Sequence, residues 1–423
     1  MNPSDDTAPR RSRIFAWTLF DFANTSFSVI IVTVIFSRYF VNHIAGGSHT
    51  LWAVALSLSM ICAAILSPPL GAAADSSHKR KQFLFIFTLV SVLSTGALFF
   101  VRDGMIITGM LLFVLANTGF EGGLVFYDSF LPGLTSRQSY GRVSGYGFAM
   151  GYLGALVVLL IVLMILPDAA HPDYLYYVRL SFVVAAAFFF LFSLPMFLFV
   201  PEPSQKRPPQ ASYFRSGMAQ ATKTFRSLFV LREFPSVSRF LIAFFLYNDG
   251  ILTVIAFAAI FAERVLHMTD RDIIIFFAIV QTAAVVGSIV FGILADKIGP
   301  KKTISITLLL WIGISIGAYF VATITAFYGV ALVAGVAMGS SQSASRSLMA
   351  LLTPGERAAE FFGFYDGLCG KASAVVGPLI YGVIADLSSE KMAALFISVF
   401  FVGGLVILQG VKEPQHAHAA SAT

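Results

Sequence analysis

Long apolar runs alternate with short polar stretches along almost the whole chain. A helix needs about 20 mostly apolar residues to cross the hydrocarbon core of a bilayer, and the runs are close to that length. The pattern predicts twelve transmembrane helices, six on each side of a polar stretch at 201–238. The predicted spans are 15–41, 51–70, 83–101, 105–127, 144–166, 176–200, 239–262, 273–295, 303–323, 326–352, 361–385 and 392–410.

The composition agrees with an all-α membrane protein. Of the 423 residues, 57% are hydrophobic and only 12% are charged, and the mean hydropathy is +0.82. A soluble domain of this composition would lack the polar surface that water requires. The net charge of +6 is spread in short clusters rather than gathered in one basic arm, so we expect no nucleic-acid partner.

The two cysteines give no sign of a metal or disulfide chemistry. Cys62 and Cys369 both lie within apolar runs, and no Cys/His spacing typical of a zinc site surrounds either of them. We therefore expect no disulfide, no metal site and no cofactor.

Basic residues mark alternate loops and so predict the orientation. By the positive-inside rule, the loops that carry them and both termini lie in the cytoplasm. The first span is too long for a signal-peptide core and lacks a small-residue cleavage site, so we expect it to be retained. The basic loops contain Arg10 to Arg13, Lys79 to Lys81, Arg137 with Arg142, the central segment, Lys297 with Lys301 and Lys302, and Arg357.

The polar stretch divides the chain into predicted domains. We expect a first six-helix half at 1–200, a linker at 201–238, a second half at 239–414 and a disordered tail at 415–423. After "PEPSQKRPPQ", the linker places apolar residues at helical spacing beside basic ones, which predicts an amphipathic helix on the cytoplasmic face; the alternative is a solvated linker. The apolar positions are Phe214, Met218, Ala221, Phe225 and Leu228, and the basic ones are Arg215, Lys223 and Arg226.

The two halves share short motifs at matching places. "GAAADSSHKRK" begins at Gly71 and "GILADKIGPKK" at Gly292, each between the second and third spans of its half. The halves also end alike, with "VPEP" at 200–203 and "VKEP" at 411–414. A tandem repeat of six spans implies a binding cleft near the bilayer midplane between the halves.

The second of these loops resembles the signature loop of the major facilitator superfamily. The residues that fit the signature are Gly292, Leu294, Ala295, Asp296, Gly299, Lys301 and Lys302. The first copy keeps Asp75, Arg80 and Lys81 but has His78 where the second glycine would lie.

A narrower resemblance covers nearly the whole chain. "WTLFDFANTSF", "FYDSFLP" and "SQSASRSLMALLTPGERAAEFFGFYDGLCGKASAVVGP" are similar to the vacuole effluxer family of that superfamily. The resemblance implies a secondary transporter; eukaryotic members are associated with amino-acid efflux from the vacuole, and bacterial members mostly lack an assigned substrate. One departure from the resemblance is Asp128, because the family motif resembles one with Asn at this position. We expect an integral protein of a bacterial inner membrane.

The signature loops suggest latches. An Asp at a helix end can cap the N-terminus of a neighbouring span while a basic residue holds it. In the superfamily such contacts close the cytoplasmic side in one state and break in the other. The alternative is that the charges are only topological anchors. The resemblance assigns gating to Asp75 and Asp296, with Arg80 and Lys301 as their support, and the predicted gating residues also include Gly71, Gly292 and Gly299.

Ionisable residues also occur inside the apolar runs, where an ion that faces lipid costs several kcal/mol, so they should face the cleft or each other. At about 1.5 Å per residue, Asp249 and Lys371 lie roughly 15 Å inside their spans. Burial raises the pKa of a carboxyl group and a nearby cation lowers it, which is the chemistry of proton coupling. We hypothesise that Asp249, and secondarily Glu121 and Asp21, carry protons.

The buried cations have a complementary role in this hypothesis. Lys371 and Arg346 would attract a substrate carboxylate or balance an empty-site acid. The alternative is a structural Lys371 to Asp366 pair, although a five-residue separation is poor geometry on an α-helix. Asp21 and Asp366 lie nearer the cytoplasmic ends, where a capping or water-exposed role is also open. Other candidates for substrate or proton coupling are Asn24, Asp128, Asn248, Gln342 and Tyr365.

The sequence argues against rival classes. "GLCGK" lacks the upstream glycine of a phosphate loop, since that position is Tyr365, and no nucleophile or metal set of an enzyme is present. We predict a monomeric, proton-coupled carrier that works by alternating access on a small solute such as an amino acid, with membrane lipids around it. The alternatives are a receptor on a transporter fold and a carrier of drugs or other small organic solutes.

Overall fold

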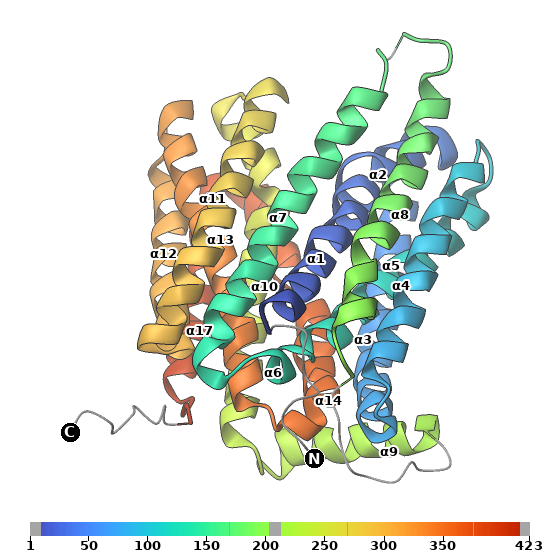
Figure 1. Cartoon of the computed structure of the whole chain (residues 1–423). Helices are drawn as coiled ribbons and strands as arrows, with labels where there is room; N and C mark the ends of the chain where they lie inside the picture. The colour runs from blue at the N-terminus through green and yellow to red at the C-terminus, as the bar shows by residue number, and fades with distance from the viewer. Residues whose placement is uncertain (1–9, 169, 203–212, 269, 375, 415–423) are drawn as a thin grey trace. The chain divides into compact units, whose positions relative to one another are not determined.

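The described residues form helices joined by short turns (Figure 1). The computed structural model describes residues 10–168, 170–202, 213–268, 270–374 and 376–414. Within these ranges eleven helical stretches are long and apolar enough to cross a membrane, which confirms the all-α membrane fold. They are Arg11–Ile44, Thr50–Ser77, Arg80–Phe100, Ile106–Leu134, Arg137–Ile165, Tyr174–Phe199, Pro235–Leu266, Ile275–Ile298, Pro300–Phe320, Ile324–Leu352 and Glu390–Gln409.

The chain forms two compact units that do not follow the predicted halves. The first comprises Met1–Phe130, Gly147–Ala219 and Ala359–Lys371, and the second comprises Leu131–Tyr146, Gln220–Ala358 and Ala372–Thr423. Each unit therefore contains one short segment from the other half of the sequence. The predicted tail at 415–423 and most of "PEPSQKRPPQ" lie outside the described residues.

Most helices of the first unit come from the first half of the chain. Its helices from that half are α1 (Arg10–Phe27), π-helix η1 (Ser28–Val34), α2 (Phe36–Tyr39), π-helix η2 (Phe40–Ile44), α3 (His49–Ser77), α4 (Arg80–Ala97), 3₁₀-helix η3 (Leu98–Phe100), α5 (Ile106–Asp128), most of α7 (Tyr140–Ile165) and α8 (Tyr174–Phe199). α5 packs on α3 and α4, and α1 packs on α8. The close fit of α5 on α4 requires Gly119, because a side chain there would strike the backbone of Phe87 and Ser91.

The second unit is built mainly from α10 onward. Its helices are α6 (Leu131–Leu134), 3₁₀-helix η4 (Arg137–Ser139), π-helix η5 (Arg226–Val230), α10 (Pro235–Leu266), α11 (Asp270–Ile298), α12 (Pro300–Phe320), α13 (Ile324–Leu352), 3₁₀-helix η6 (Gly355–Arg357), α15 (Val376–Leu387), α16 (Glu390–Phe396) and α17 (Ser398–Gln409). α11 packs closely on α13. Gly287, Gly335 and Gly339 allow this approach, since a side chain at each would strike the facing backbone.

The eleventh predicted span, 361–385, is interrupted. It consists of α14 (Ala358–Phe362) and the π-helix η7 (Gly363–Gly370), and after a break it continues as α15, which has only 12 residues. The amide of Gly377 at the start of α15 donates to Asp249 rather than to a preceding turn of its own span. The chain passes from the first unit to the second between Lys371 and Ala372, just before this break.

The linker contains the predicted helix, α9 (Tyr213–Phe225), followed by η5. Its expected apolar face is divided: Ala221 and Leu228 are buried, whereas Met218 and Phe225 are 42% and 47% exposed. The side chains of Phe214 and Arg215 lie outside the described part of the chain. Protein contacts thus take up part of the face that the sequence assigned to the membrane surface, and the position of α9 on that surface stays a prediction.

Candidate functional site

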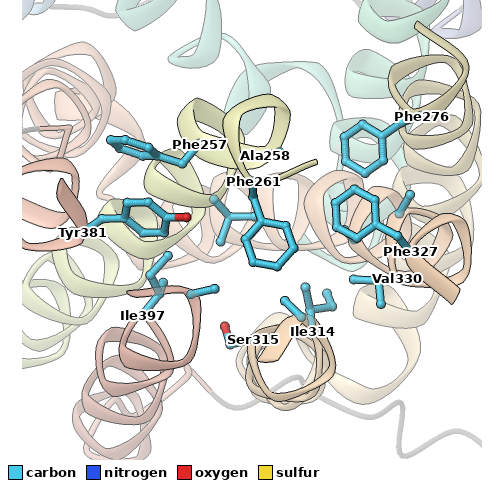
Figure 2. Close-up of a pocket in the computed structure, with 15 residues that line it drawn as sticks. Phe257, Ala258, Phe261, Phe276, Ile314, Ser315, Phe327, Val330, Tyr381 and Ile397 are labelled. Atoms are coloured by element: carbon cyan, nitrogen blue, oxygen red, sulfur yellow. The ribbon is translucent and has the colours of Figure 1, made fainter. Parts of the chain in front are cut away.

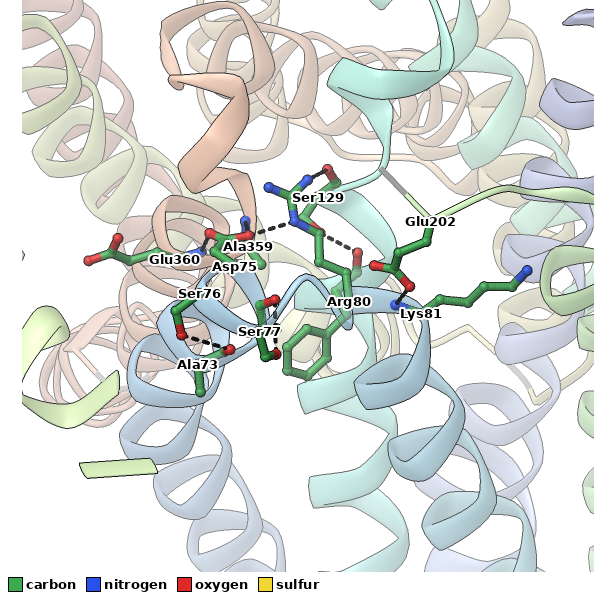
Figure 3. A network of polar contacts seen from close by, with 12 residues as sticks. Ala73, Asp75, Ser76, Ser77, Arg80, Lys81, Ser129, Glu202, Ala359 and Glu360 are labelled. Atoms are coloured by element: carbon green, nitrogen blue, oxygen red, sulfur yellow. Dashed lines mark hydrogen bonds and ion pairs between the residues drawn. The ribbon is translucent and has the colours of Figure 1, made fainter. Parts of the chain in front are cut away.

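The first signature loop caps a helix in the first unit. Asp75, in the last turn of α3, accepts hydrogen bonds from the amides of Ala359 at 3.2 Å and Glu360 at 2.8 Å. These N–H groups belong to the first turn of α14, where they have no partner within their own helix. Arg80 donates from Nε to Asp75 at 2.5 Å, and both side chains are only 5% exposed (Figure 3). The geometry is the cap that the sequence predicts; its opening and closing remain a prediction.

The cap depends on close approach of two backbones. A side chain at Gly71, one turn before Asp75, would collide with the carbonyl oxygen of Ala359. Arg80 also donates to the carbonyl of Ser129 at 3.4 Å, so one guanidinium joins the loop, the cap and the end of α5.

Each half ends in a glutamate that caps its own third helix. Glu202 of "VPEP" accepts from the amide of Lys81 at 2.9 Å, at the start of α4, and Figure 3 shows this contact beside Arg80. Glu413 of "VKEP" accepts from the amide of Lys301 at 2.6 Å, at the start of α12. Burial raises the pKa of Glu202, and the amides and cations around it oppose this shift. The matched half-ends are the sequence signal for these two caps, although the candidate residues chosen from the sequence include neither glutamate.

The second signature loop repeats the cap in the second unit. Asp296 accepts from the amides of Gly141 at 2.8 Å and Arg142 at 3.2 Å, at the start of α7. Its cationic partner is Arg142, whose Nε lies 2.6 Å from the carboxylate and whose side chain is 48% exposed.

Lys301 does not support Asp296, contrary to the sequence hypothesis. Its ammonium donates to the carbonyls of Gln409 and Val411, both at 2.8 Å. Because Pro300 starts α12 directly after the turn, Lys301 points to the end of α17 while the capped helix supplies the cation for Asp296. Gly292 opposes Gly141, and a side chain at Gly292 would strike its carbonyl oxygen. Gly299 forms the turn with a φ of 94°, which favours glycine.

A buried cluster of three charges lies in the first unit. The ammonium of Lys371 pairs with Glu121 on α5 and lies 3.4 Å from Asp366 on η7. Lys371 and Glu121 side chains are 12% and 10% exposed. The five-residue spacing of Asp366 and Lys371 would be unfavourable on the α-helix that the sequence predicts. The intervening turn is a π-helix, whose i to i+5 periodicity brings these positions together.

Asp249 is fully buried in the second unit, and few hydrogen-bond donors offset the cost of burying its carboxylate. Both carboxylate oxygens accept from a single amide, that of Gly377, at 2.8 and 2.9 Å. Among the described residues the carboxylate of Asp249 has no cationic partner. The adjacent Asn248 donates to Ser373 at 2.7 Å, so two neighbouring residues of α10 hold the break in the eleventh span.

Asp21 joins two helices of the first unit. It accepts from the hydroxyl of Tyr127 on α5 at 2.8 Å and from Asn24 at 3.4 Å. The ring of Tyr127 stacks on Trp17 with centroids 4.6 Å apart, which fixes this link. Two other candidates of the same unit are buried: Asp128 at the end of α5 and Tyr365 on η7.

Arg346 holds α13 to the start of α7 within the second unit. It donates to the hydroxyl of Ser144 at 3.0 Å and to its carbonyl at 2.8 Å. Ser144 in turn donates to the carbonyl of Ser343 at 2.9 Å. Gln342 lies one turn before Arg346 on the same helix. The sequence did not predict this packing contact of Arg346, and its substrate-facing role stays a prediction.

An apolar cavity of about 60 Å³ lies in the second unit, near the ends of α10, α12 and α13. Figure 2 shows Phe257, Phe261, Phe327 and Tyr381 around it, with the Ser315 hydroxyl as a polar group among them. Such a lining cannot satisfy a charged solute. Within the described ranges no group of three or more His, Cys, Asp or Glu residues is placed to hold a metal.

Comparison with known proteins gives consistent family matches. A family model described as "Vacuole effluxer Atg22 like" matches residues 39–421. YxiO of Bacillus subtilis (strain 168), an uncharacterized MFS-type transporter, is 29% identical over 411 residues, and the alignment covers 94% of each chain. Autophagy-related protein 22 of Yarrowia lipolytica is 22% identical over 443 residues, with 85% of this chain and 74% of that protein covered.

Solved transporter structures share the fold. The E. coli fucose:proton symporter FucP gives a TM-score of 0.75 at 13% identity, covering 97% of this chain and 100% of that one. The human organic anion transporter MFSD10 gives 0.77 at 15% identity, covering 95% and 100%. At these identities the likeness concerns the fold alone.

Proposed function

Because the chain belongs to the vacuole effluxer Atg22-like family of the major facilitator superfamily, we propose that it is a proton-coupled exporter of a small zwitterion such as an amino acid. The broader function follows from the family: the protein is an integral membrane secondary transporter of small molecules and not an enzyme. The solute, the coupling ion and the direction are the proposed parts.

The charge imbalance around Lys371 carries the proposal. One ammonium faces two carboxylates, those of Glu121 and Asp366, so the fully ionised cluster has one excess negative charge in a mostly buried place. A bound proton or the ammonium group of a substrate can occupy the carboxylate that is left without a cation of its own, and each excludes the other. Competition between a proton and a substrate cation for one charge is the elementary requirement of antiport.

Asp249 supports proton coupling independently. A fully buried carboxylate with one amide donor is costly to ionise, which suits a group that takes up and releases a proton. Since Asp249 caps α15 through Gly377, gain or loss of the proton changes the strength of that cap. The proton is thereby coupled to the position of the extracellular half of the eleventh span.

A zwitterion suits the Lys371 cluster. A substrate carboxylate can replace one protein carboxylate at the ammonium of Lys371, while a substrate ammonium pairs with the carboxylate released. A neutral sugar would satisfy neither charge. The family match and the basic loops support export across a bacterial inner membrane with both termini in the cytoplasm.

The test is uptake of labelled amino acids into proteoliposomes with and without an imposed pH gradient. We compare wild type with Asp249→Asn and Lys371→Ala, using Asp103→Asn and Lys302→Ala as matched controls, because both control residues are exposed. Gradient-driven accumulation that is lost in both test variants and kept in both controls supports the proposal.

Two other outcomes contradict it. If Asp249→Asn accumulates solute with an unchanged pH dependence, Asp249 does not carry the coupled proton. If no amino acid moves under any gradient, the zwitterion assignment is wrong and organic cations become the next solutes to assay.

A further inference from the structure

The apolar cavity of the second unit contains a buried hydroxyl that has no partner among the described residues. The hydroxyl belongs to Ser315 on α12, which is 2% exposed and whose Oγ makes no hydrogen bond in the described part of the chain. Figure 2 shows it directed toward the aromatic rings that line the cavity. The cavity shares no residue with the Lys371 cluster or with the Asp249 cap, so it is separate from the residues that carry the proposed function.

Ser315 differs from the other serine and threonine residues of α12. Thr303, Ser305 and Thr307 each donate to a carbonyl oxygen within one turn of their own helix, at 2.9, 3.0 and 2.8 Å. This is a common way for a hydroxyl in an apolar environment to find a partner. Ser315 lacks such a bond, and a buried polar atom without a partner calls for a bound group.

A water molecule alone does not suit the site. A buried water needs roughly two to four polar partners, whereas Ser315 offers one and the hydroxyl of Tyr381 already donates to Glu390 at 2.8 Å. None of the described lining residues is charged, so an ion would lose its hydration without compensation. The missing group must therefore bring an apolar body of its own.

Aromatic rings form two walls on opposite sides of the cavity (Figure 2). Phe327 on α13 stacks on Phe276 of α11, with centroids 4.9 Å apart, and on Phe261 of α10 at 5.6 Å. On the other side Tyr381 of α15 stacks on Phe257 of α10 at 4.2 Å. Walls of this kind stabilise an apolar body through burial and dispersion.

The volume limits the size of the ligand. The cavity has about 60 Å³, and one water-sized sphere needs about 15 Å³, so there is room for about four non-hydrogen atoms. A molecule with an aromatic ring, such as phenol, is too large.

We propose that this cavity binds a short-chain alcohol, of which 1-propanol is the representative. The alkyl chain lies between the two aromatic walls, and the hydroxyl forms a hydrogen bond with Ser315. A hydroxyl can accept from Ser315 or donate to it, whereas a ketone of the same size can only accept. An alkylammonium ion would bring a charge that the cavity cannot compensate.

A bound alcohol would stabilise α15 in its described position. The ring of Tyr381 lies on Phe257, and its hydroxyl donates to Glu390, the first residue of α16. Tyr381 therefore attaches α15 to two other helices at the wall of the cavity. If the alcohol binds only while Tyr381 is in place, it slows local opening of α15 by a factor of one plus the ratio of its concentration to its Kd.

The experiment titrates 1-propanol into the purified full-length protein, labelled at the δ1-methyl groups of isoleucine and observed by NMR. Ile314 and Ile397 line the cavity and should show saturable shifts, with a Kd on the order of 1 mM. Ile86 on α4, which is 52% exposed, is the internal control, and its shifts should grow linearly as alcohol enters the detergent. At four times the Kd, hydrogen exchange of the α15 amides should slow about fivefold.

A series of alcohols distinguishes the cavity from the detergent. Binding should tighten about fourfold for the methylene added from ethanol to 1-propanol, and the gain should end by 1-pentanol because the cavity is then full. Partition into detergent continues to rise with chain length. A gain in affinity that continues to 1-hexanol would therefore contradict the proposal.

Variants test the role of the hydroxyl. Ser315→Ala should weaken 1-propanol about fivefold, the change expected for one neutral hydrogen bond, and should leave binding of xenon, an apolar probe, at least as tight. Its matched control is Ser305→Ala, which removes a hydroxyl from the same helix outside the cavity and should change either affinity less than about twofold. Ala331→Leu fills the cavity and should abolish binding of both probes.

Folding of the main variant is not expected to obscure the result. Ser315→Ala removes no hydrogen bond from the alcohol-free protein, so it should not lower the thermal unfolding midpoint. A clear fall in that midpoint would show that the hydroxyl already has a partner and would remove the basis of the proposal.

Three further results would overturn the proposal. One is an equal affinity for 1-propanol in wild type and Ser315→Ala, which would leave a purely apolar cavity that the end of an acyl chain could fill. Another is binding of acetone as tight as that of 1-propanol, which would show that the site does not select an alcohol. The third is a response of Ile314 and Ile397 that stays linear like that of Ile86.

Discussion

The two signature loops close the same contact with different supports. In both, an aspartate at the end of one helix accepts two amides from the first turn of another. Asp75 is held by Arg80 of its own loop, a cation with a 5% exposed side chain. Asp296 is held by Arg142 of the helix it caps, a cation with a 48% exposed side chain. The repeat has preserved the backbone contact, while the charge that supports it differs in origin and in exposure.

This difference determines how the supporting cation is solvated once the aspartate of each latch is removed. When Asp75 is removed, the buried guanidinium of Arg80 loses its carboxylate partner and cannot easily regain water. When Asp296 is removed, Arg142 is already half in solvent and regains water readily. The first latch is therefore the costlier one to break by mutation.

The largest effect should follow Asp75→Ala. Removing one partner of a buried ion pair costs about 3–5 kcal/mol, and we expect a loss of this size in the free energy of unfolding, measured by chemical denaturation in detergent. Arg80→Gln in the same chain should restore part of the loss, because the buried cation without a carboxylate beside it is then absent. A loss no larger than that of Asp296→Ala would remove the distinction between the latches.

Substitution of the facing glycines should have similar effects in the two loops. In Gly71→Ala and Gly292→Ala the new methyl group meets a carbonyl oxygen of the capped segment, and overpacking of this kind costs about 1–3 kcal/mol. The measurement is the unfolding midpoint of each variant, with Gly313→Ala as control, because no atom lies within 4 Å of that added methyl group. Unequal losses would show that the two backbone contacts differ as well as their supports.

Asp296→Ala should cost less than Asp75→Ala. We expect about 1–2 kcal/mol, mainly from the two amides of α7 that lose their acceptor. Arg142→Gln, which keeps those amides bonded, should cost less than about 1 kcal/mol because the pair is solvent-exposed. Denaturation at low and high salt measures both; a large cost for Arg142→Gln would contradict the comparison.

The smallest effect concerns the helix cap behind the first latch. Burial raises the pKa of Glu202, so the folded protein binds this proton more tightly than the unfolded chain. The resulting stabilisation is full below the ordinary pKa of 4.5 and is lost as the pH rises through the folded-state pKa. The measurement is the free energy of unfolding of wild type and Glu202→Gln at several pH values. On acidification this free energy should rise more in the wild type than in the variant, by less than about 1 kcal/mol. A gain on raising the pH would have the wrong sign.

Much of the fold follows from the order of apolar and polar residues along the sequence. Length and hydropathy place the spans because a bilayer imposes a fixed thickness, and the repeated Gly and Asp positions predict the two caps. Both features depend on local sequence and on a rule that applies to every membrane protein.

The parts that the sequence did not predict depend on local departures from the α-helix or on long-range partners. The π-turn at η7 makes Asp366 and Lys371 neighbours, and no apolar period reveals such a turn. Asp296 pairs with Arg142 and not with Lys301, and this choice of partner depends on which helix lies next to the loop. The glutamate caps were visible as a repeated motif, but their partners lie more than a hundred residues away in sequence.

The break in the eleventh span gives its two parts separate partners. Residues before the break supply the amides that Asp75 caps, whereas the amide at the start of α15, beyond the break, is capped by Asp249. Substitutions in α15 can accumulate without altering the peptide groups of the latch. The cap at Asp249 and the cap at Asp75 can thus vary independently within one span.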